Sequence, residues 1–513
     1  MKKLNAFIYT LIIFTAISCK KDIVEKTEGI AALNPTSTDA NAGDWKTILL
    51  SSGSEIFVET PLIITNPLYV AELNEIKGLQ QNITQSQQKD MEYWAAGGIL
   101  RWNEIMRELV AKYNLPPYQN EDGTYPIPSG ANPFAYPLFP FANPPYAARA
   151  YAYIAAAQYD ALVTAWHYKK MYNRLAPYKN STGITAMVPS SDLASYPSEA
   201  AVIAGVSAEM MKLLFPTEIA NIEKKAANHK LSMMCAGTAT RSDMEAGEEL
   251  GRAVAQKFIL KARSDKAGLA VGNPTLWDKL ETDCLAKGRT PWISLELPKR
   301  PPMLPFFGNV VPIIMPQAKL MALMPDAPPA AGSPQLIKET AEVLEFCKKQ
   351  DRENIRIAHF WADGAGTYAP PGHWNAIAAT DFIEQNLSEV RWSRNMALLN
   401  LTMMDAAIIT WKTKYEYYNG RPCQVNPEIK TFTGVPNFPA YISGHSTFSG
   451  AAATILGYLT PSRANDYMQM AEEASKSRIV SGIHFRSDCE VGLEVGKKVG
   501  AYFVERGKID GAQ

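Results

Sequence analysis

Three short segments near the C-terminal end concentrate side chains that could bind and transform an anion. They are KYEYYNGRP (residues 414–422), PAYISGH (439–445) and RIVSGIHFRSD (478–488). Each segment alone is a weak signal, but together they supply three cations, a serine hydroxyl, a glycine amide and two histidines. A tetrahedral oxyanion requires this set, because cations neutralise its charge and the planar fork of arginine can grip two oxygens. The candidate anion-binding cations are Lys414, Arg421 and Arg478.

The middle segment places its polar groups where a helix begins. The sequence STFSGAAATILGYL after His445 is typical of a helix, so Gly444 and His445 are expected at its N-terminus. Free backbone amides and the helix dipole favour an anion at that end. We expect the Ser443 hydroxyl and the Gly444 amide to donate hydrogen bonds to its oxygens.

The third segment pairs a histidine with a carboxylate. His484 and Asp488 are four residues apart, which predicts that they share one helical face. Gly482 is expected to break the chain between two helices and to turn His484 inward from Arg478. The carboxylate could then hold the imidazole in one tautomer and raise its basicity. An ordinary surface contact or a metal-binding pair on one face are the alternatives for His484 and Asp488.

Helical periodicity dominates the rest of the chain, and no convincing alternating strand is present. The sequence therefore predicts an all-α protein, with two helical bundles in one compact unit and the site in the second bundle. The expected helices span residues 91–113, 147–173, 198–213, 217–236, 242–264, 335–347, 351–362, 373–386, 389–418, 446–459, 463–479 and 486–506.

A proline-rich stretch separates the two halves of the chain. Residues 291–334 hold eleven prolines, which excludes a regular helix or a central strand. A flexible linker between domains is one interpretation of this stretch. Apolar runs such as LPFFGNVVPIIMP favour the other, an ordered loop that wraps the body. We therefore predict an N-terminal helical half at 46–334, including this loop, and a C-terminal bundle at 335–513.

The N-terminus has the pattern of an export signal. Lys2 and Lys3 precede a short apolar run that ends at Ser18 and Cys19, too short for a comfortable membrane span. This stretch resembles a bacterial lipoprotein signal, which implies that residues 1–18 are removed and that Cys19 becomes lipidated. Residues 19–45 would form a tether, and the protein would be exported to the periplasm or the cell surface, anchored to the outer membrane. An ordinary cleaved signal is the alternative.

Composition excludes several other classes of protein. Lys plus Arg and Asp plus Glu both number 51, so bulk charge does not favour nucleic-acid binding. The six cysteines form no CxxC pair, which argues against a cysteine zinc site. Five of them remain besides the lipidated Cys19, and because this number is odd, at least one is expected to be a free thiol or to pair between molecules.

The ordered pattern K-x6-R-P, S-G-H and R-x5-H-x3-D resembles the superfamily of vanadium-dependent haloperoxidases and type 2 phosphatidic-acid phosphatases. Every charged and histidine position of the pattern is present. The resemblance covers most of residues 90–506, although only the C-terminal part is specific. One departure is Ile442, which stands where the family usually has a proline directly before Ser-Gly-His.

Further residues resemble haloperoxidases more than the small membrane phosphatases. The segment FWADGAGTYAPPGHWN (360–375) includes Asp363, which resembles an acid that accompanies the catalytic histidine of chloroperoxidases. Trp411 and Phe438 fall where haloperoxidases carry aromatic residues around the site. Plain core packing is the alternative for Trp411, Phe438 and Phe360. Of the other histidines, only His359, four residues before Asp363, is a candidate to support the pocket.

The resemblance implies a bound vanadate and a separate role for each residue around it. His484 would be the only direct protein ligand to vanadium, and Lys414, Arg421, Ser443, Gly444 and Arg478 would hold the oxygens. His445 would take a proton from hydrogen peroxide, and Lys414 could polarise the bound peroxide. Halide would then be oxidised to a hypohalous species that halogenates a small organic acceptor.

The same residues could serve other chemistry. In an acid phosphatase without vanadate, His484 would attack a phosphate ester to form a phosphohistidine, and His445 would protonate the leaving group. A glycan-binding lipoprotein and a family member that binds an anion without turnover are weaker alternatives. The sequence thus indicates the kind of site more firmly than the reaction.

Overall fold

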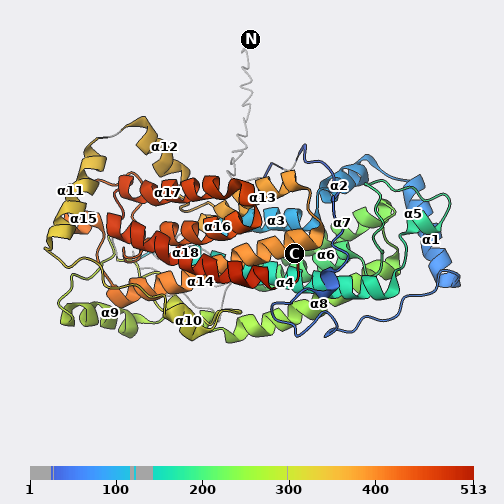
Figure 1. Cartoon of the computed structure of the whole chain (residues 1–513), viewed down its shortest axis with the longest axis horizontal. Coiled ribbons are helices and arrows are strands. Elements are labelled where there is room, and N and C mark those ends of the chain that lie inside the picture. Colours follow the sequence, from blue (N-terminus) through green and yellow to red (C-terminus); the bar gives the residue numbers. More distant parts are fainter. Residues whose placement is uncertain are drawn as a thin grey trace, which may run out of the picture.

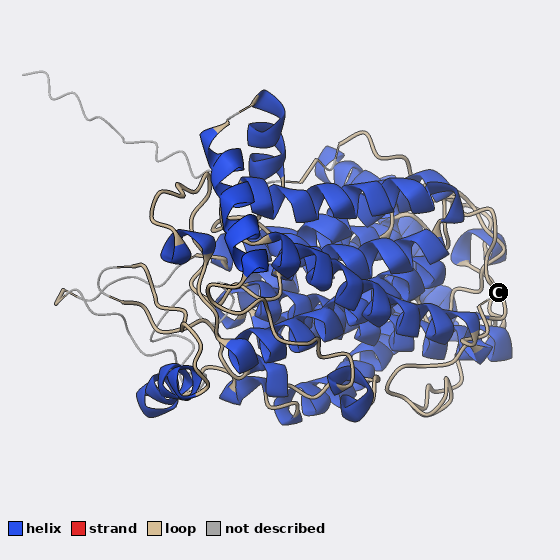
Figure 2. Cartoon of the chain, turned by 60° about the vertical axis from the view of Figure 1, so that its left-hand side comes forward, coloured by secondary structure: helices blue, strands red, loops and turns tan. Residues whose placement is uncertain are grey.

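The chain folds into α-helices joined by loops, as the computed structural model shows for residues 25–26, 28–115, 121–122, 143–296, 299–349 and 351–512. These described residues form no strand, which confirms the predicted all-α class (Figures 1 and 2). The helices are α1 (Pro67–Gln81), α2 (Gln85–Ala95), α3 (Gly98–Tyr113), α4 (Pro144–Tyr172), α5 (Pro177–Asn180), α6 (Glu199–Leu214), α7 (Ile219–Cys235), α8 (Arg241–Ser264), α9 (Pro274–Ala286), α10 (Gln317–Met321), α11 (Pro334–Lys348), α12 (Arg352–Phe360), α13 (Ala369–Gln385), α14 (Glu389–Tyr417), α15 (Pro422–Val425), α16 (Gly444–Leu459), α17 (Ala464–Val480) and α18 (Arg486–Lys508).

Most helices agree with the periodicity of the sequence, but the first part of the chain differs. The helix expected over residues 91–113 is interrupted at Gly97, whose φ of 119° lies in a region that L side chains rarely adopt. Helices α1, α5, α9, α10 and α15 were not predicted, and the short α10 lies in the proline-rich stretch where a regular helix was excluded. In α1 the buried residues Tyr69, Leu73 and Ile76 follow helical spacing, whereas α9 buries only Cys284 and therefore shows little periodicity.

Two groups of helices pack side by side along the long axis of the molecule (Figure 1). Helices α6, α7 and α8 lie with α4 in the first group, and α16, α17 and α18 lie with α14 in the second. The two 29-residue helices, α4 and α14, pack against each other and join the groups into one body.

Small residues allow the helices of the second group to approach closely. A methyl group added at Gly450 of α16 would lie 2.4 Å from the Leu493 carbonyl oxygen of α18. One added at Gly496 of α18 would lie 2.2 Å from the Thr447 carbonyl oxygen of α16. Neither position can hold a side chain without separating the two helices.

The described part of the proline-rich stretch is an ordered loop that lies along α14. Leu304 and Phe307 are buried. The Met303 carbonyl accepts hydrogen bonds from Trp411 Nε1 (3.2 Å) and from the Tyr415 hydroxyl (2.6 Å). The packed alternative is therefore confirmed for residues 299–334.

Residues 28–45 are part of the folded body. Asp39 forms an ion pair with Arg391 of α14, and the Lys46 amide donates to the Asp510 carbonyl at 2.8 Å. Residues 28–45, assigned above to a tether, are thus fixed to the helices by these contacts and by the buried Trp45. The proposed signal at residues 1–18 and Cys19 lie outside the described residues.

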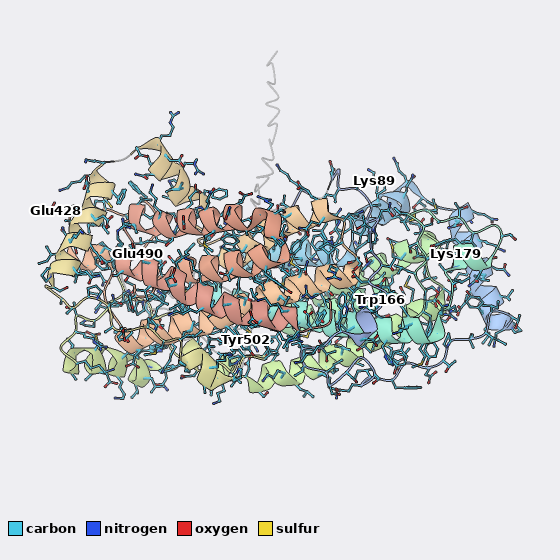
Figure 3. The ribbon with its side chains drawn as sticks, in the orientation of Figure 1. Lys89, Trp166, Lys179, Glu428, Glu490 and Tyr502 are labelled. Atoms are coloured by element: carbon cyan, nitrogen blue, oxygen red, sulfur yellow. The ribbon has the colours of Figure 1, made fainter. Side chains whose placement is uncertain are left out.

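Charged side chains of both signs lie at the two ends of the elongated body, and several of them are paired, as Lys179 is with Asp192 and Glu428 with Lys348. Lys89 and Lys179 project near α1 and α2, and Glu428 and Glu490 project near α11 and α15 (Figure 3). Among the described residues, no helix is both long enough and apolar enough to cross a membrane. The five described cysteines are free thiols: Cys235, Cys284, Cys347, Cys423 and Cys489.

Candidate active site

The anion-binding residues predicted from sequence meet where the ends of α14, α16, α17 and α18 gather, at the end of the body that holds α11, α12 and α15 (Figure 1). His484 lies in the loop between α17 and α18. Gly482, with a φ of 77°, makes the turn that brings it there. The predicted break at Gly482 is therefore confirmed.

Hydrogen bonds fix the tautomer of His484. Its Nδ1 lies 3.0 Å from Asp488 Oδ2, and its Nε2 lies 2.9 Å from Arg421 Nη1. Because arginine only donates, Nε2 must accept, and the proton resides on Nδ1, where the carboxylate accepts it. Burial is the main cause that holds the pKa of His484 well below its ordinary value, and the positive charge of the nearby Arg421 is the second. The imidazole is therefore neutral, with its lone pair on Nε2.

The expectation that His484 and Asp488 share a helical face is wrong in its geometry. α18 begins at Arg486, so His484 precedes the helix and only Asp488 lies on it. Asp488 Oδ2 also accepts the Phe485 amide at 3.0 Å and so caps the first turn. Burial raises the pKa of Asp488. The carboxylate both starts the helix and orients the histidine.

Backbone carbonyls hold the two cations from the first segment. Lys414 Nζ, at the end of α14, donates to the carbonyl oxygens of Pro439 (2.9 Å) and Ala440 (2.8 Å). Arg421 donates to the Phe438 carbonyl from both Nε (3.0 Å) and Nη2 (2.8 Å). These contacts fix the two side chains and leave Lys414 one further N–H to donate.

The site carries more buried positive charge than negative charge. Lys414, Arg421 and Arg478 are fully or almost fully buried. Burial is the main cause that lowers the pKa of Lys414 well below its ordinary value, and the positive charge of the neighbouring Arg421 adds to it. Burial also lowers the pKa of Arg421 and that of Arg478 to about 10. Asp488 and Asp363 are the carboxylates that counter these three cations, so an anion would complete the balance.

Arg478 reaches the site from the last turn of α17. Its Nε donates to the Ser477 hydroxyl at 2.8 Å, and its Nη2 donates to the Ala358 carbonyl of α12 at 3.4 Å. Asp363 partly offsets the effect of burial on its pKa. Contacts with α17 and α12 thus position Arg478 near the carboxylate of Asp363.

The Ser-Gly-His segment begins α16, as predicted. Ser443 is the N-cap residue, and its hydroxyl oxygen accepts the Ser446 amide at 3.3 Å. The hydroxyl can also donate one hydrogen bond. A methyl group added at the buried Gly444 would meet only Trp411 Cζ3, at 3.9 Å. A cradle large enough for a ligand oxygen therefore lies beside the first amides of the helix.

His445 faces Asp363 across the site. Its Nε2 lies 3.4 Å from Asp363 Oδ2, close enough for an ionic contact but outside hydrogen-bond geometry. Burial and Arg478 lower the pKa of His445 to about 4, although Asp363 acts in the opposite direction. His445 is therefore neutral near pH 7 and can accept a proton.

Asp363 has its hydrogen bond from a residue that the sequence did not single out. His373 Nδ1, near the start of α13, lies 3.0 Å from Asp363 Oδ1. Burial alone would raise the pKa of Asp363, but His373 and His445 hold it below its ordinary value. His359, the predicted supporter, is exposed on α12, and no contact joins it to Asp363.

The predicted aromatic residues line the site. The Phe438 ring lies 5.1 Å from Lys414 Nζ and 5.0 Å from Arg421 Cζ, within the range of a cation–π interaction. Trp411 packs against Phe438 with ring centroids 5.1 Å apart. Phe360 is half exposed, and its ring contacts His373. Ile442 is buried after a cis peptide bond with Tyr441 and displaces no polar group of the site.

Residues 395–505, which hold all nine of the pattern residues, match the PAP2 superfamily. This part of the chain is similar to the PAP2 superfamily. The match begins inside α14 and ends inside α18, so it contains the second group of helices. The FWADG segment with Asp363 and His373 precedes this PAP2 region.

Solved structures extend the likeness beyond the PAP2 region. A bacterial vanadium-dependent iodoperoxidase matches with a TM-score of 0.55 at 21% identity, covering 71% of this chain and 91% of that one. The apo form of a bacterial vanadium-dependent chloroperoxidase matches with a TM-score of 0.50 at 13% identity, covering 71% and 93%. The chain thus has a vanadium haloperoxidase-like fold.

One curated relative matches in sequence over a short stretch. The vanadium chloroperoxidase of Curvularia inaequalis is 30% identical over 141 residues, which cover 22% of this chain. The match spans only 23% of the length of that relative.

Proposed function

We propose that this protein is a vanadate-dependent haloperoxidase that uses hydrogen peroxide to oxidise halide and thereby halogenates a small organic acceptor. The observation that carries the proposal is the His484 Nε2 lone pair among three buried cations. In the structure it accepts a hydrogen bond from Arg421 Nη1, which would turn to an oxygen of vanadate when Nε2 binds vanadium. The vanadium haloperoxidase-like fold supports it, as does the FWADG segment outside the PAP2 region.

The residues fit vanadate on several independent counts. Three buried cations face only two carboxylates, and Gly444 leaves space beside the start of α16. His445 Nε2 lacks a hydrogen-bond partner among the described side chains. In the same described part of the chain, no cluster of three His, Cys, Asp or Glu side chains could hold a bare metal ion. An oxyanion bound through one histidine agrees with this set of donors.

Each side chain then has a defined task. Bound vanadate would supply a Lewis-acidic centre that activates peroxide towards halide. His484 would bind it through Nε2, with Asp488 fixing the Nδ1 proton. Arg421, Arg478 and the remaining N–H of Lys414 would neutralise the oxygens. His445 would accept the proton of hydrogen peroxide, because it is neutral at working pH.

Halogenation by the purified protein tests the proposal. The assay supplies bromide or iodide, hydrogen peroxide and an organic acceptor, with and without orthovanadate. We expect halogenation that requires vanadate and is lost in His484→Ala, while a surface control, His359→Asn, retains it. Vanadate binding without oxidation of either halide would refute the haloperoxidase proposal.

An acid phosphatase is the second candidate, and the geometry of His484 favours it specifically. A neutral imidazole with its lone pair on Nε2, backed by a carboxylate on Nδ1, is also suited to attack phosphorus. The decisive assay is hydrolysis of p-nitrophenyl phosphate without vanadate. Turnover that is inhibited by vanadate and lost in His484→Ala, with no halogenation, would establish the phosphatase.

We also propose export and a lipid on Cys19, on the basis of the N-terminal sequence alone. The test is the partition of the expressed protein between membrane and soluble fractions. Cys19→Ala should move it out of the membrane fraction, and an unchanged partition would contradict the anchor.

A further inference from the structure

The carboxylate of Asp363 faces His445 but is poorly fixed by its own backbone. It lies in the loop between α12 and α13, at a positive φ of 44°. Its Oδ2 makes the 3.4 Å contact with His445 Nε2, which is not a hydrogen bond. Among the described residues, its one hydrogen bond is the one that Oδ1 accepts from His373 Nδ1. The direction of Oδ2 therefore depends on His373.

His373 is itself held firmly. It lies near the start of the 17-residue helix α13 and is buried. Its ring stacks on the buried Trp361, with centroids 4.6 Å apart, and meets the edge of Phe360 at 5.0 Å. Because Asp363 is ionised and can only accept, Nδ1 of His373 must carry the proton of this hydrogen bond.

We infer that His373 is a positioning residue, which holds Asp363 against His445 and thereby maintains His445 as an effective acid–base group. This inference rests on the proposed function of the oxyanion site. The other titratable or charged groups around Asp363 are Arg478 from α17 and Tyr368 from the same loop as Asp363, directly before α13. Neither donates a hydrogen bond to the carboxylate, so neither replaces His373.

Two substitutions separate the hydrogen bond from the packing of the ring. His373→Phe keeps an aromatic ring on Trp361 but removes the donor. His373→Asn loses the ring, but its Nδ2 can occupy the place of Nδ1. We expect a loss of kcat/KM of about 10- to 100-fold in His373→Phe, as is typical for groups that orient an active-site residue, and near-normal activity in His373→Asn. His359→Asn is the matched control, because His359 does not contact Asp363.

The pH profile provides a readout that a loss of folded protein would not change. Asp363 favours protonated His445, so its displacement makes His445 harder to protonate. The acid limb of the profile should therefore move to lower pH in His373→Phe and stay in place in His373→Asn. Equal losses in both variants with an unmoved limb would assign His373 to packing and overturn the inference, as would wild-type behaviour in both.

A double-mutant cycle with Asp363→Ala tests whether His373 acts through Asp363. We expect His373→Phe to have no further effect once Asp363 is removed, whereas independent effects would multiply and contradict the inference. Should His373→Phe not fold, as judged by its melting curve, His373→Ala with added imidazole replaces it. Imidazole should then restore activity in that variant and not in Asp363→Ala, and equal responses would overturn the inference.

The outcome also separates this inference from the proposed function. If the wild-type protein neither halogenates nor hydrolyses phosphate esters, the proposed function fails. If the wild-type protein is active and the His373 variants behave like it, only the role of His373 fails.

Discussion

A single methyl group at Gly444 should separate the binding of the anion from the stability of the fold. Gly444 is the first residue of α16 and is buried, yet an added methyl group would meet only Trp411 Cζ3 at 3.9 Å. Gly450, two turns further along the same helix, is the opposite case, because its methyl group would lie 2.4 Å from the Leu493 carbonyl oxygen. The two substitutions to alanine should therefore have contrasting effects.

The magnitudes follow from these contacts. Gly444→Ala should leave the free energy of unfolding unchanged or raise it by about 0.4–1 kcal/mol, since alanine restricts the unfolded chain. Gly450→Ala should lower it by about 1–3 kcal/mol through overpacking. In the site, the Gly444 methyl group would displace one oxygen of the anion. Loss of one charge-assisted hydrogen bond, worth about 1.5–3 kcal/mol, would weaken binding roughly 10- to 150-fold.

Thermal unfolding with and without orthovanadate measures both effects. Wild-type protein and Gly450→Ala should each gain stability from the bound anion, from different starting points. Gly444→Ala should melt like the wild type without vanadate and gain much less from it. An undiminished vanadate shift in Gly444→Ala would refute the cradle at the start of α16. So would a loss of stability in the absence of vanadate as large as that of Gly450→Ala.

Three further predictions concern the histidines. Asp488→Asn should weaken vanadate binding by about 10- to 100-fold, because Nδ1 of His484 loses its acceptor. Titration measures the Kd, and an unchanged Kd would argue against the tautomer with the proton on Nδ1. Because burial and Arg478 lower the pKa of His445 to about 4, kcat/KM should stay level from pH 7 to about 5 and fall near pH 4. An acid limb near pH 6.5 would contradict the burial of His445 beside Arg478. Burial lowers the pKa of His229 from 6.5 to about 3, so the unfolded chain binds the extra proton and stability should fall as pH drops between these values, by at most about 5 kcal/mol. Urea unfolding at several pH values should show a flatter dependence in His229→Gln, and equal slopes would exclude this contribution.

The main groups of the site could be predicted from sequence because their chemistry is written in local patterns. The spacing of Lys414 and Arg421 and the Ser-Gly-His turn each fix a cation or an amide relative to a nearby helix end. The helix after His445 follows from its apolar and small residues, and the break before His484 follows from Gly482. Periodicity also predicted most of the helices, because apolar and small residues recur along them at helical spacing.

The residues that sequence reasoning missed depend on contacts across loops. His359, four residues before Asp363, matched helical spacing, but α12 ends at Phe360 and Asp363 lies beyond it. His373 is ten residues after Asp363, and the turn that joins them has no periodic signal. The PPGHW sequence at the start of α13 was the available clue, because prolines mark a helix start and place His373 close to it.

The contact that holds Glu25 to the helices also limits how the protein could sit on a membrane. Arg107 of α3 forms an ion pair with Glu25 at 2.6 Å, so the chain is already held by the body at that point. With the proposed lipid on Cys19, five residues would separate the anchor from this contact. The six residue steps from Cys19 to Glu25 span about 20 Å when fully extended. The enzyme would then work close against the bilayer and draw its substrates from the thin aqueous layer beside it.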